Sequence, residues 1–310
     1  TITLASFCRR VGIAFEVFSF NDSSVHWDMQ KVTHGATFDD YVNSVKVNSW
    51  IPKKEVALRN MLSSEMNNQQ FKETASLLLQ LTNNMDNGYH RFGLTYDDFC
   101  TTPLNDSLLI LHQYIPSFIK KTGVEKVNMV VLTDGGDNGS SNVLRNNVNR
   151  KYLSGDIDNR PWRRRKQIVR DKIHNKIMVH ESGHFTASFV DHMRNCHNMN
   201  AIGFMLCKAR REIEYALDNF ICDTSTYKSY FENKEVKKVA RTEIRKNGFV
   251  SAKDEGYNEY FIIKSTDTKD EELNVNSSMT KGAIGREFAK HNRSKKTNRQ
   301  LLNKFVDLVK

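Results

Sequence analysis

The sequence predicts an α/β protein built on a doubly wound, mostly parallel sheet with helices on both faces and a basic insertion. Short apolar runs of strand length recur at residues 13–20, 127–132 and 200–206. Segments with apolar residues at helical spacing lie between them, which is typical of chains that alternate strand and helix. Residues 138–165 have little apolar pattern and many Asn and Arg residues, which indicates an exposed insertion that extends to about residue 180.

The N-terminal elements are expected to be a helix, a strand and a long helix. One helix face gathers the apolar side chains Leu4, Phe7, Cys8 and Val11. Gly12 follows as the C-terminal stop. Residues 13–20 are apolar on both faces, which favours a buried parallel strand. Residues 53–83 show apolar side chains three and four residues apart, which predicts a helix.

The next helix is expected to follow Thr102, with Asn105 or Asp106 as its cap. Pro116 is expected to kink this helix. Its apolar face comprises Leu108, Leu111, His112, Ile115 and Ile119. Beyond the strand at 127–132, the pattern predicts a hairpin over 167–179, a helix over 185–196, a strand over 200–206, a helix through Ile213, Leu217 and Phe220, a strand over 256–263 and a terminal helix over 301–309.

Composition limits the classes of protein. The 310 residues hold no apolar run long enough to span a membrane and no N-terminal signal pattern, so we expect a cytoplasmic protein. The five cysteines form no Cys-x-x-Cys pair, which fits a reducing compartment. The net charge of +10 could favour nucleic acid or an acidic protein surface. A solvated lysine-rich surface is preferred, because no nucleic-acid motif accompanies the charge.

Two segments carry oxygen ligands at places where a doubly wound sheet binds its ligands. Asp134 ends the apolar strand at 127–132, and Thr102 stands in the loop before the preceding helix. Ligands of such sheets bind just beyond the carboxyl ends of parallel strands. A hydroxyl from Thr102, a carboxylate from Asp134 and water would supply part of the octahedral oxygen set that Mg²⁺ requires. Asp137 is a candidate for an outer position around such an ion.

These two segments, Thr101 to Leu108 and Val130 to Asn138, resemble the second and third metal loops of von Willebrand factor A (VWA) domains. The downstream half is similar to VWA proteins of tailed bacteriophages that are described as cobaltochelatase T-subunit-like. The resemblance implies a subunit that is not catalytic by itself. It would bind a protein target through Mg²⁺ or Mn²⁺ and work with a ring-forming AAA+ ATPase, in the host cytoplasm if a phage encodes it.

The chain departs from the family pattern at its start. The family's first strand and its Asp-x-Ser-x-Ser loop would precede the helix at which this sequence begins. We therefore expect weak binding of Mg²⁺ or Mn²⁺ by these residues alone. The expected domains are a VWA-like domain over 1–223, truncated at its N-terminus, and an extension over 224–310 that packs on it.

Two alternatives remain open. His180-Glu181-Ser182-Gly183-His184 matches the His-Glu-x-x-His motif, which on a helix holds zinc in metallopeptidases. Gly183 disfavours a helix, so a polar turn before the next helix is preferred. Arg163-Arg164-Arg165-Lys166 could contact a phosphate backbone in a nucleic-acid-associated phage protein, although such runs are more often simply solvated.

Overall fold

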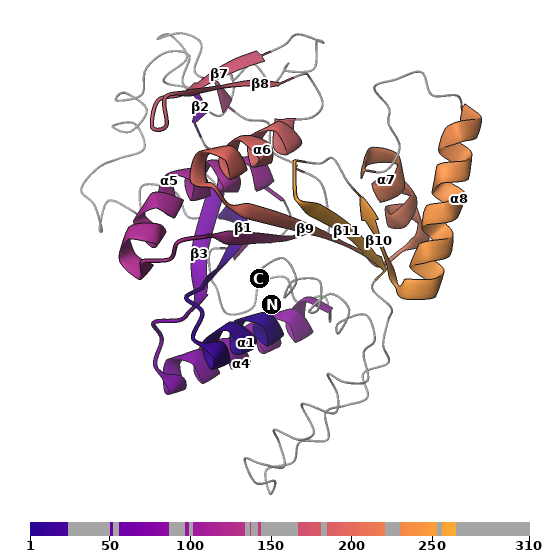
Figure 1. Ribbon diagram of the computed structural model, residues 1–310. Helices are drawn as coiled ribbons and strands as arrows, with labels where there is room; N and C mark the ends of the chain where they lie inside the picture. Colours follow the sequence, from indigo (N-terminus) through magenta and orange to yellow (C-terminus); the bar gives the residue numbers. More distant parts are fainter. Residues whose placement is uncertain are drawn as a thin grey trace, which may run out of the picture. The chain divides into compact units, whose positions relative to one another are not determined.

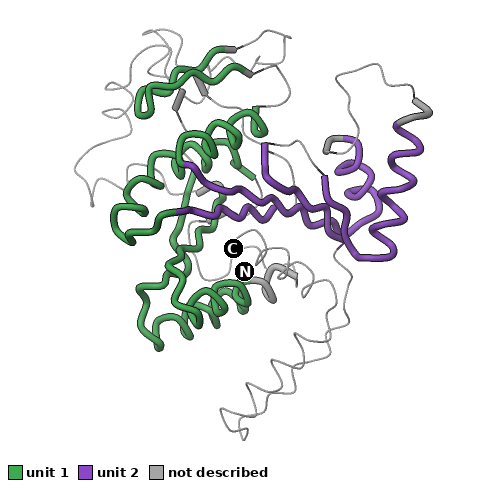
Figure 2. Tube along the Cα trace, viewed as in Figure 1, with its two compact units in different colours: residues 1–125, 135–197 green, residues 126–134, 198–310 purple. Residues whose placement is uncertain are grey.

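The computed structural model describes residues 1–23, 50–51, 56–86, 97–98, 102–133, 137, 142–143, 167–180, 185–220, 230–252 and 256–264. The predicted α/β class is confirmed, because helices accompany a mixed sheet whose pairings are mostly parallel (Figure 1). The chain divides into two compact units (Figure 2). Unit 1 comprises residues 1–125 and 135–197, and unit 2 comprises residues 126–134 and 198–310.

Unit 1 contains an antiparallel sheet in which β1 (Glu16–Ser23) lies between β3 (Val56–Ser63) and β4 (Asp97–Asp98). A strand was predicted at 13–20, but its parallel direction was wrong. A run that is apolar on both faces indicates burial, whereas the direction of a strand depends on the neighbour with which it pairs.

The helix predicted over 53–83 is two elements, the strand β3 and the helix α4 (Asn68–Asp86). Apolar residues in β3 fall at helical spacing, yet pairing with β1 decides their conformation. Asn67 Oδ1 accepts hydrogen bonds from the backbone amides of Gln69 and Gln70 and so caps α4. The predicted first helix is confirmed as α1 (Ile2–Val11), which ends at Gly12 with a positive φ of 75°.

Side chains of α1, β3 and α4 form an apolar core in unit 1. Ala5, Leu62 and Phe71 are buried together. Partly buried side chains pack around them: Phe15, Val17, Met66 and Leu78. Burial of apolar surface therefore holds the two helices against the antiparallel sheet.

The helix predicted after Thr102 is α5 (Leu104–Thr122), but its predicted cap is wrong. Pro103 occupies the cap position and both Asn105 and Asp106 lie inside the first turn. The carboxylate of Asp137 caps this helix instead, because it accepts the backbone amide of Asn105 at 3.0 Å and the side-chain amide at 2.8 Å. A carboxylate at this end is favoured by the helix dipole.

The remaining described elements of unit 1 are a fourth helix and short antiparallel pairs of strands. The predicted hairpin is confirmed as β7 (Gln167–Asp171) and β8 (Lys176–His180). The predicted helix that follows is α6 (Phe185–His197), which packs against α5 and β8. β2 (Trp50–Ile51) pairs with β6 (Asn142–Val143), so residues within the predicted insertion also pair with an earlier segment.

Unit 2 is a four-stranded sheet in the order β10 (Phe249–Ala252), β11 (Glu259–Lys264), β9 (Asn200–Cys207) and β5 (Asn128–Thr133). β9 is parallel to both β11 and β5, and β10 is antiparallel to β11. The strands predicted at 127–132, 200–206 and 256–263 are thereby confirmed.

Two helices pack against this sheet. The predicted α7 (Arg210–Phe220) contacts β9 and β11, and α8 (Tyr230–Asn247), which was not predicted, contacts β10. The predicted boundary at residue 223 and the predicted helix over 301–309 lie outside the described residues. Within the described part of the chain, no helix is both long and apolar enough to cross a membrane.

Candidate metal centre

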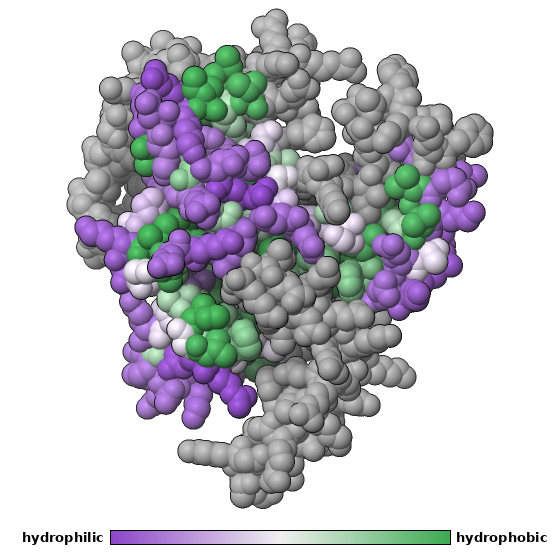
Figure 3. All heavy atoms as spheres, in the orientation of Figure 1, coloured by the Kyte–Doolittle hydropathy of each residue, from purple (hydrophilic) through white to green (hydrophobic). Residues whose placement is uncertain are grey.

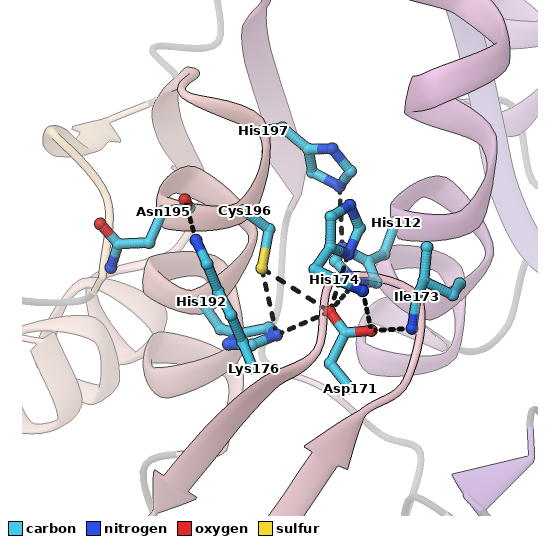
Figure 4. A network of polar contacts seen from close by, with 9 residues as sticks. All are labelled: His112, Asp171, Ile173, His174, Lys176, His192, Asn195, Cys196 and His197. Carbon is cyan, nitrogen blue, oxygen red and sulfur yellow. Dashed lines mark hydrogen bonds and ion pairs between the residues drawn. The ribbon is translucent and has the colours of Figure 1, made fainter.

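Six side chains of unit 1 meet between α5, the β7–β8 hairpin and α6 (Figure 4). The hairpin supplies Asp171 and His174, and α5 supplies His112. The helix α6 supplies three further side chains: His192, Cys196 and His197. Residues that are 85 positions apart in sequence, such as His112 and His197, are thus brought into hydrogen-bonding distance.

Asp171 is the centre of this cluster. Its Oδ2 lies 2.9 Å from His112 Nε2, 2.8 Å from His174 Nδ1 and 3.0 Å from His192 Nε2. The Sγ of Cys196 lies 3.6 Å from the same oxygen. The other oxygen, Oδ1, accepts the backbone amides of Ile173 and His174. The turn therefore fixes the carboxylate with one oxygen pointing at the three imidazoles and the thiol.

Local structure explains this arrangement. In the hairpin, Asn175 has a φ of 51°, a conformation that Asn tolerates, and it closes the turn between Asp171 and Lys176. On α5, His112 lies four residues after the buried Leu108 and therefore on the same buried helix face. On α6, His192 and Cys196 are also four residues apart, which explains their contact of 3.4 Å.

The cluster is buried and lies against aromatic side chains. The side chains of His112, Asp171 and His192 are 5%, 8% and 8% exposed, and that of His174 is 18% exposed. The ring of Phe189 packs edge-on against His112 at a centroid distance of 5.6 Å. Low exposure strengthens electrostatic interactions within the cluster, because little water screens them.

Burial favours the neutral form of two imidazoles of this cluster, those of His112 and His197. Burial lowers the pKa of His112, and it lowers the pKa of His197 to about 4. Burial alone would raise the pKa of Asp171, but hydrogen bonds from His112, His192 and His174 outweigh it and hold this pKa far below its usual range. Burial raises the pKa of the Cys196 thiol to about 11. At neutral pH, the histidines His112 and His197 therefore keep a nitrogen lone pair.

The arrangement is suited to holding a metal ion. Four donor atoms, one each from His112, Asp171, His174 and Cys196, lie within 4.8 Å of one another. A nucleophilic Cys-His-Asp triad fits less well. The base of such a triad uses one ring nitrogen for the nucleophile and the other for the carboxylate. Here the same nitrogen of His192, Nε2, contacts both Cys196 and Asp171.

The residues predicted to bind metal are not among these six. Thr102 is half-buried beside α5, and its carbonyl accepts the backbone amide of Leu104. Asp134 lies outside the described residues. Asp137 caps α5 through Asn105, and Asn105 Oδ1 also accepts the Thr186 hydroxyl at 2.8 Å.

The alternative motifs fall largely outside the described residues. His180 ends β8, whereas 181–184 lie beyond the described part of the chain. The same holds for the basic run at 163–166. The described residues therefore do not test the peptidase and nucleic-acid alternatives, and both stay predictions.

Sequence reasoning missed this cluster because its parts are separated. His192 and His197, near Cys196, have no recognisable metal-ligand spacing, which predicts surface or half-buried side chains. His197 is indeed half-buried, whereas His192 is buried. A usable signal was present. Asp171-x-x-His174 occupies a hairpin turn, and His192-x-x-x-Cys196 occupies one helix face. Short pairs of this kind are typical of metal sites that two elements build together.

Comparison of the chain with protein-family profiles, with curated proteins and with solved structures gives no match in any of the three. The class of protein is therefore inferred from the site itself.

Proposed function

We propose that this protein binds a zinc ion through His112, Asp171, His174 and Cys196, and that the ion fastens the β7–β8 hairpin to the helices α5 and α6. The single observation that carries the proposal is the convergence of four donor atoms from three elements within 4.8 Å. A group of nitrogen, oxygen and sulfur donors at this spacing is what a four-coordinate ion requires.

The types of donor favour zinc. Imidazole nitrogen, thiolate sulfur and carboxylate oxygen are the ligands of Zn²⁺, whereas Mg²⁺ prefers oxygen ligands and water. Bonds of about 2.0–2.3 Å around a tetrahedral ion separate neighbouring donors by roughly 3.3–3.7 Å. The distances from Asp171 Oδ2 to His112, His174 and Cys196 are 2.9, 2.8 and 3.6 Å. The four donor atoms lie within 4.8 Å of one another, so the two imidazoles would move away from Oδ2 and the more distant donors would move closer for the ion to bind.

A structural role is favoured over a catalytic one. Catalytic zinc usually has three protein ligands and an open position for water, whereas structural zinc has four protein ligands. The four candidate ligands come from a hairpin and two helices, so an ion among them would cross-link these elements. Met178 is the one buried apolar side chain among the hairpin residues 168–179, so apolar packing of the hairpin is sparse.

The test is the zinc content of the full chain purified without chelators, by elemental mass spectrometry. We expect one zinc per chain, and less than about a tenth of that after His174→Ala or Cys196→Ala. Cys207→Ala is the matched control, because Cys207 is a buried free cysteine of unit 2. Absence of zinc from the unchanged chain would contradict the proposal. Zinc that survives Cys196→Ala and disappears on His184→Ala would favour the peptidase motif instead.

A second candidate function is the metal-dependent adaptor that the VWA resemblance implies, working with an AAA+ ATPase and a protein target. The finer fold, a doubly wound VWA-like sheet, belongs to the same proposal. The parallel pairing of β5 with β9 supports it. So does the contact of Asn105, near Thr102, with Asp137, which follows Asp134 by three residues.

Titration with Mn²⁺, followed by electron paramagnetic resonance, tests this second function. We expect weak binding that disappears in Thr102→Ala and in Asp134→Ala. The exposed Asp191 on α6 provides a control as Asp191→Ala. Mn²⁺ binding that is unchanged by Asp134→Ala would remove the support for a VWA-type site.

A further inference from the structure

His197 makes a contact that the four-ligand site does not account for. Its Nε2 lies 2.9 Å from Nδ1 of His112 (Figure 4). The other nitrogen of His112, Nε2, faces Asp171 at 2.9 Å. His112 therefore has one nitrogen turned towards the candidate ligands and one turned towards His197.

This contact has a consequence for metal binding. An imidazole that binds a metal through Nε2 carries its proton on Nδ1, and this N–H needs a hydrogen-bond acceptor. His197 Nε2 is the nitrogen at the required distance. When Nε2 of His112 binds an ion, Nδ1 would thus donate its hydrogen bond to His197.

The position of His197 is restrained from two sides. It is the last residue of α6, and Asn198 follows with a φ of 49° that turns the chain away from the helix. Its ring also packs edge-on against His174, with a centroid distance of 4.7 Å, and against His112 at 4.8 Å. The ring of His197 is thus placed beside two candidate ligands without being one of the four donors.

We propose that His197 is a positioning residue that holds His112 in the tautomer and ring orientation that metal binding requires. The proposal rests on the proposed zinc site. The partners of metal-bound histidines orient the ring and raise its basicity, and their loss typically lowers metal affinity about 10–100-fold. We expect a loss of this size when a substitution removes the hydrogen-bond acceptor that His197 provides.

The experiment measures zinc affinity of the full chain by competition with a chromogenic chelator. His197→Leu keeps bulk without an acceptor, and His197→Gln restores an acceptor oxygen. We expect His197→Leu to weaken binding about 10–100-fold and His197→Gln to recover part of the loss. His112→Ala serves as the reference for removal of a ligand, and thermal melting of each metal-free variant identifies any that fail to fold.

Visible absorption of the Co²⁺-substituted protein separates positioning from ligation. We expect the bands to keep their wavelengths in both His197 variants, because the donor atoms are unchanged. Bands that shift in His197→Gln would identify His197 as a ligand and overturn the proposal. Equal affinity of His197→Leu and the unchanged chain, together with loss in His112→Ala, would overturn it while leaving the zinc site intact. No binding by the unchanged chain would contradict the zinc site itself.

Discussion

At the scale of single residues, the candidate site depends on how one carboxylate is held. Asp171 divides its two oxygens between the turn backbone and the cluster. A buried carboxylate without partners would be strongly disfavoured, and the imidazoles that surround it supply those partners. Asp171 and its neighbours are thus organised before an ion binds, which reduces the entropy lost on binding.

The thiol of Cys196 makes zinc binding depend on pH. The metal binds a thiolate, and in the metal-free protein burial raises the pKa of this thiol to about 11. Below that pH zinc must displace the thiol proton, so affinity should rise about tenfold per pH unit between pH 7 and 9. Burial lowers the pKa of His112, so this imidazole is already neutral and contributes no proton in this range.

Calorimetry in buffers of different ionisation enthalpy measures the protons released. We expect about one proton per zinc at pH 7.5 for the unchanged chain, and none from the weak residual binding of Cys196→Ala. A zinc complex of the unchanged chain that forms without proton release would contradict thiolate ligation by Cys196.

At the scale of elements, the β7–β8 hairpin has little apolar support. Its side chains Ile168, Ile173, Ile177 and Val179 are between 54% and 73% exposed. Apolar atoms accordingly lie on the surface over this hairpin in Figure 3. Its described attachments to the helices are mainly polar: Asp171 contacts His112 and His192, and Lys176 donates to the carbonyl of Asn195. An isolated two-stranded hairpin is marginally stable in water.

We therefore expect zinc to protect the hairpin from hydrogen exchange. Amides of 167–180 should exchange more slowly, by about tenfold or more, when zinc is bound than when it is chelated, because the ion links Asp171 and His174 to both helices. The measurement is exchange followed by mass spectrometry of peptides from the full chain. Cys196→Ala provides the control, since its hairpin should exchange at the metal-free rate with or without zinc. Equal exchange in the zinc-loaded and chelated chain would contradict the proposed role of the ion.

At the scale of the whole molecule, the candidate metal site and the core of unit 2 depend on different residues. The four candidate ligands all belong to unit 1. Unit 2 has its own core, in which Phe204 of β9 stacks on Phe261 of β11 at 5.3 Å. Gly203 of β9 pairs with Tyr260 of β11, and a Cβ at position 203 would lie 2.2 Å from Cδ2 of that ring. The absence of a side chain at 203 is therefore needed for the tyrosine to occupy its place.

Gly203→Ala should lower the stability of unit 2 without changing the binding of zinc. The clash with Tyr260 should lower the free energy of unfolding of unit 2 by about 1–3 kcal/mol, as overpacking of a core commonly does. Zinc content should stay at one per chain, since no ligand is altered. Hydrogen exchange of β9 and β11 peptides reports the first effect, and elemental analysis reports the second. Slow exchange in β9 that is identical to that of the unchanged chain would contradict the packing argument.

The local sequence pattern predicted an element correctly where one local feature, such as a C-terminal glycine or a turn sequence, decides the conformation. Gly12 ends α1 as predicted, and the β7–β8 hairpin covers the predicted residues 167–179. The pattern failed at β3, where apolar residues at helical spacing form a strand because β1 pairs with them. It also failed at the start of α5, where the cap comes from Asp137, 32 residues after Asn105.

The sequence by itself determined the α/β class, the hairpin, α6 and the strands of unit 2, because periodicity and turn residues act over a few positions. Only the tertiary structure decided strand direction and the membership of the metal cluster. His112, Asp171 and Cys196 have no local pattern in common, since they lie on a helix, at the end of a strand and on another helix. Their donor atoms meet because α5, the hairpin and α6 pack together, and such packing depends on contacts between residues far apart in the chain.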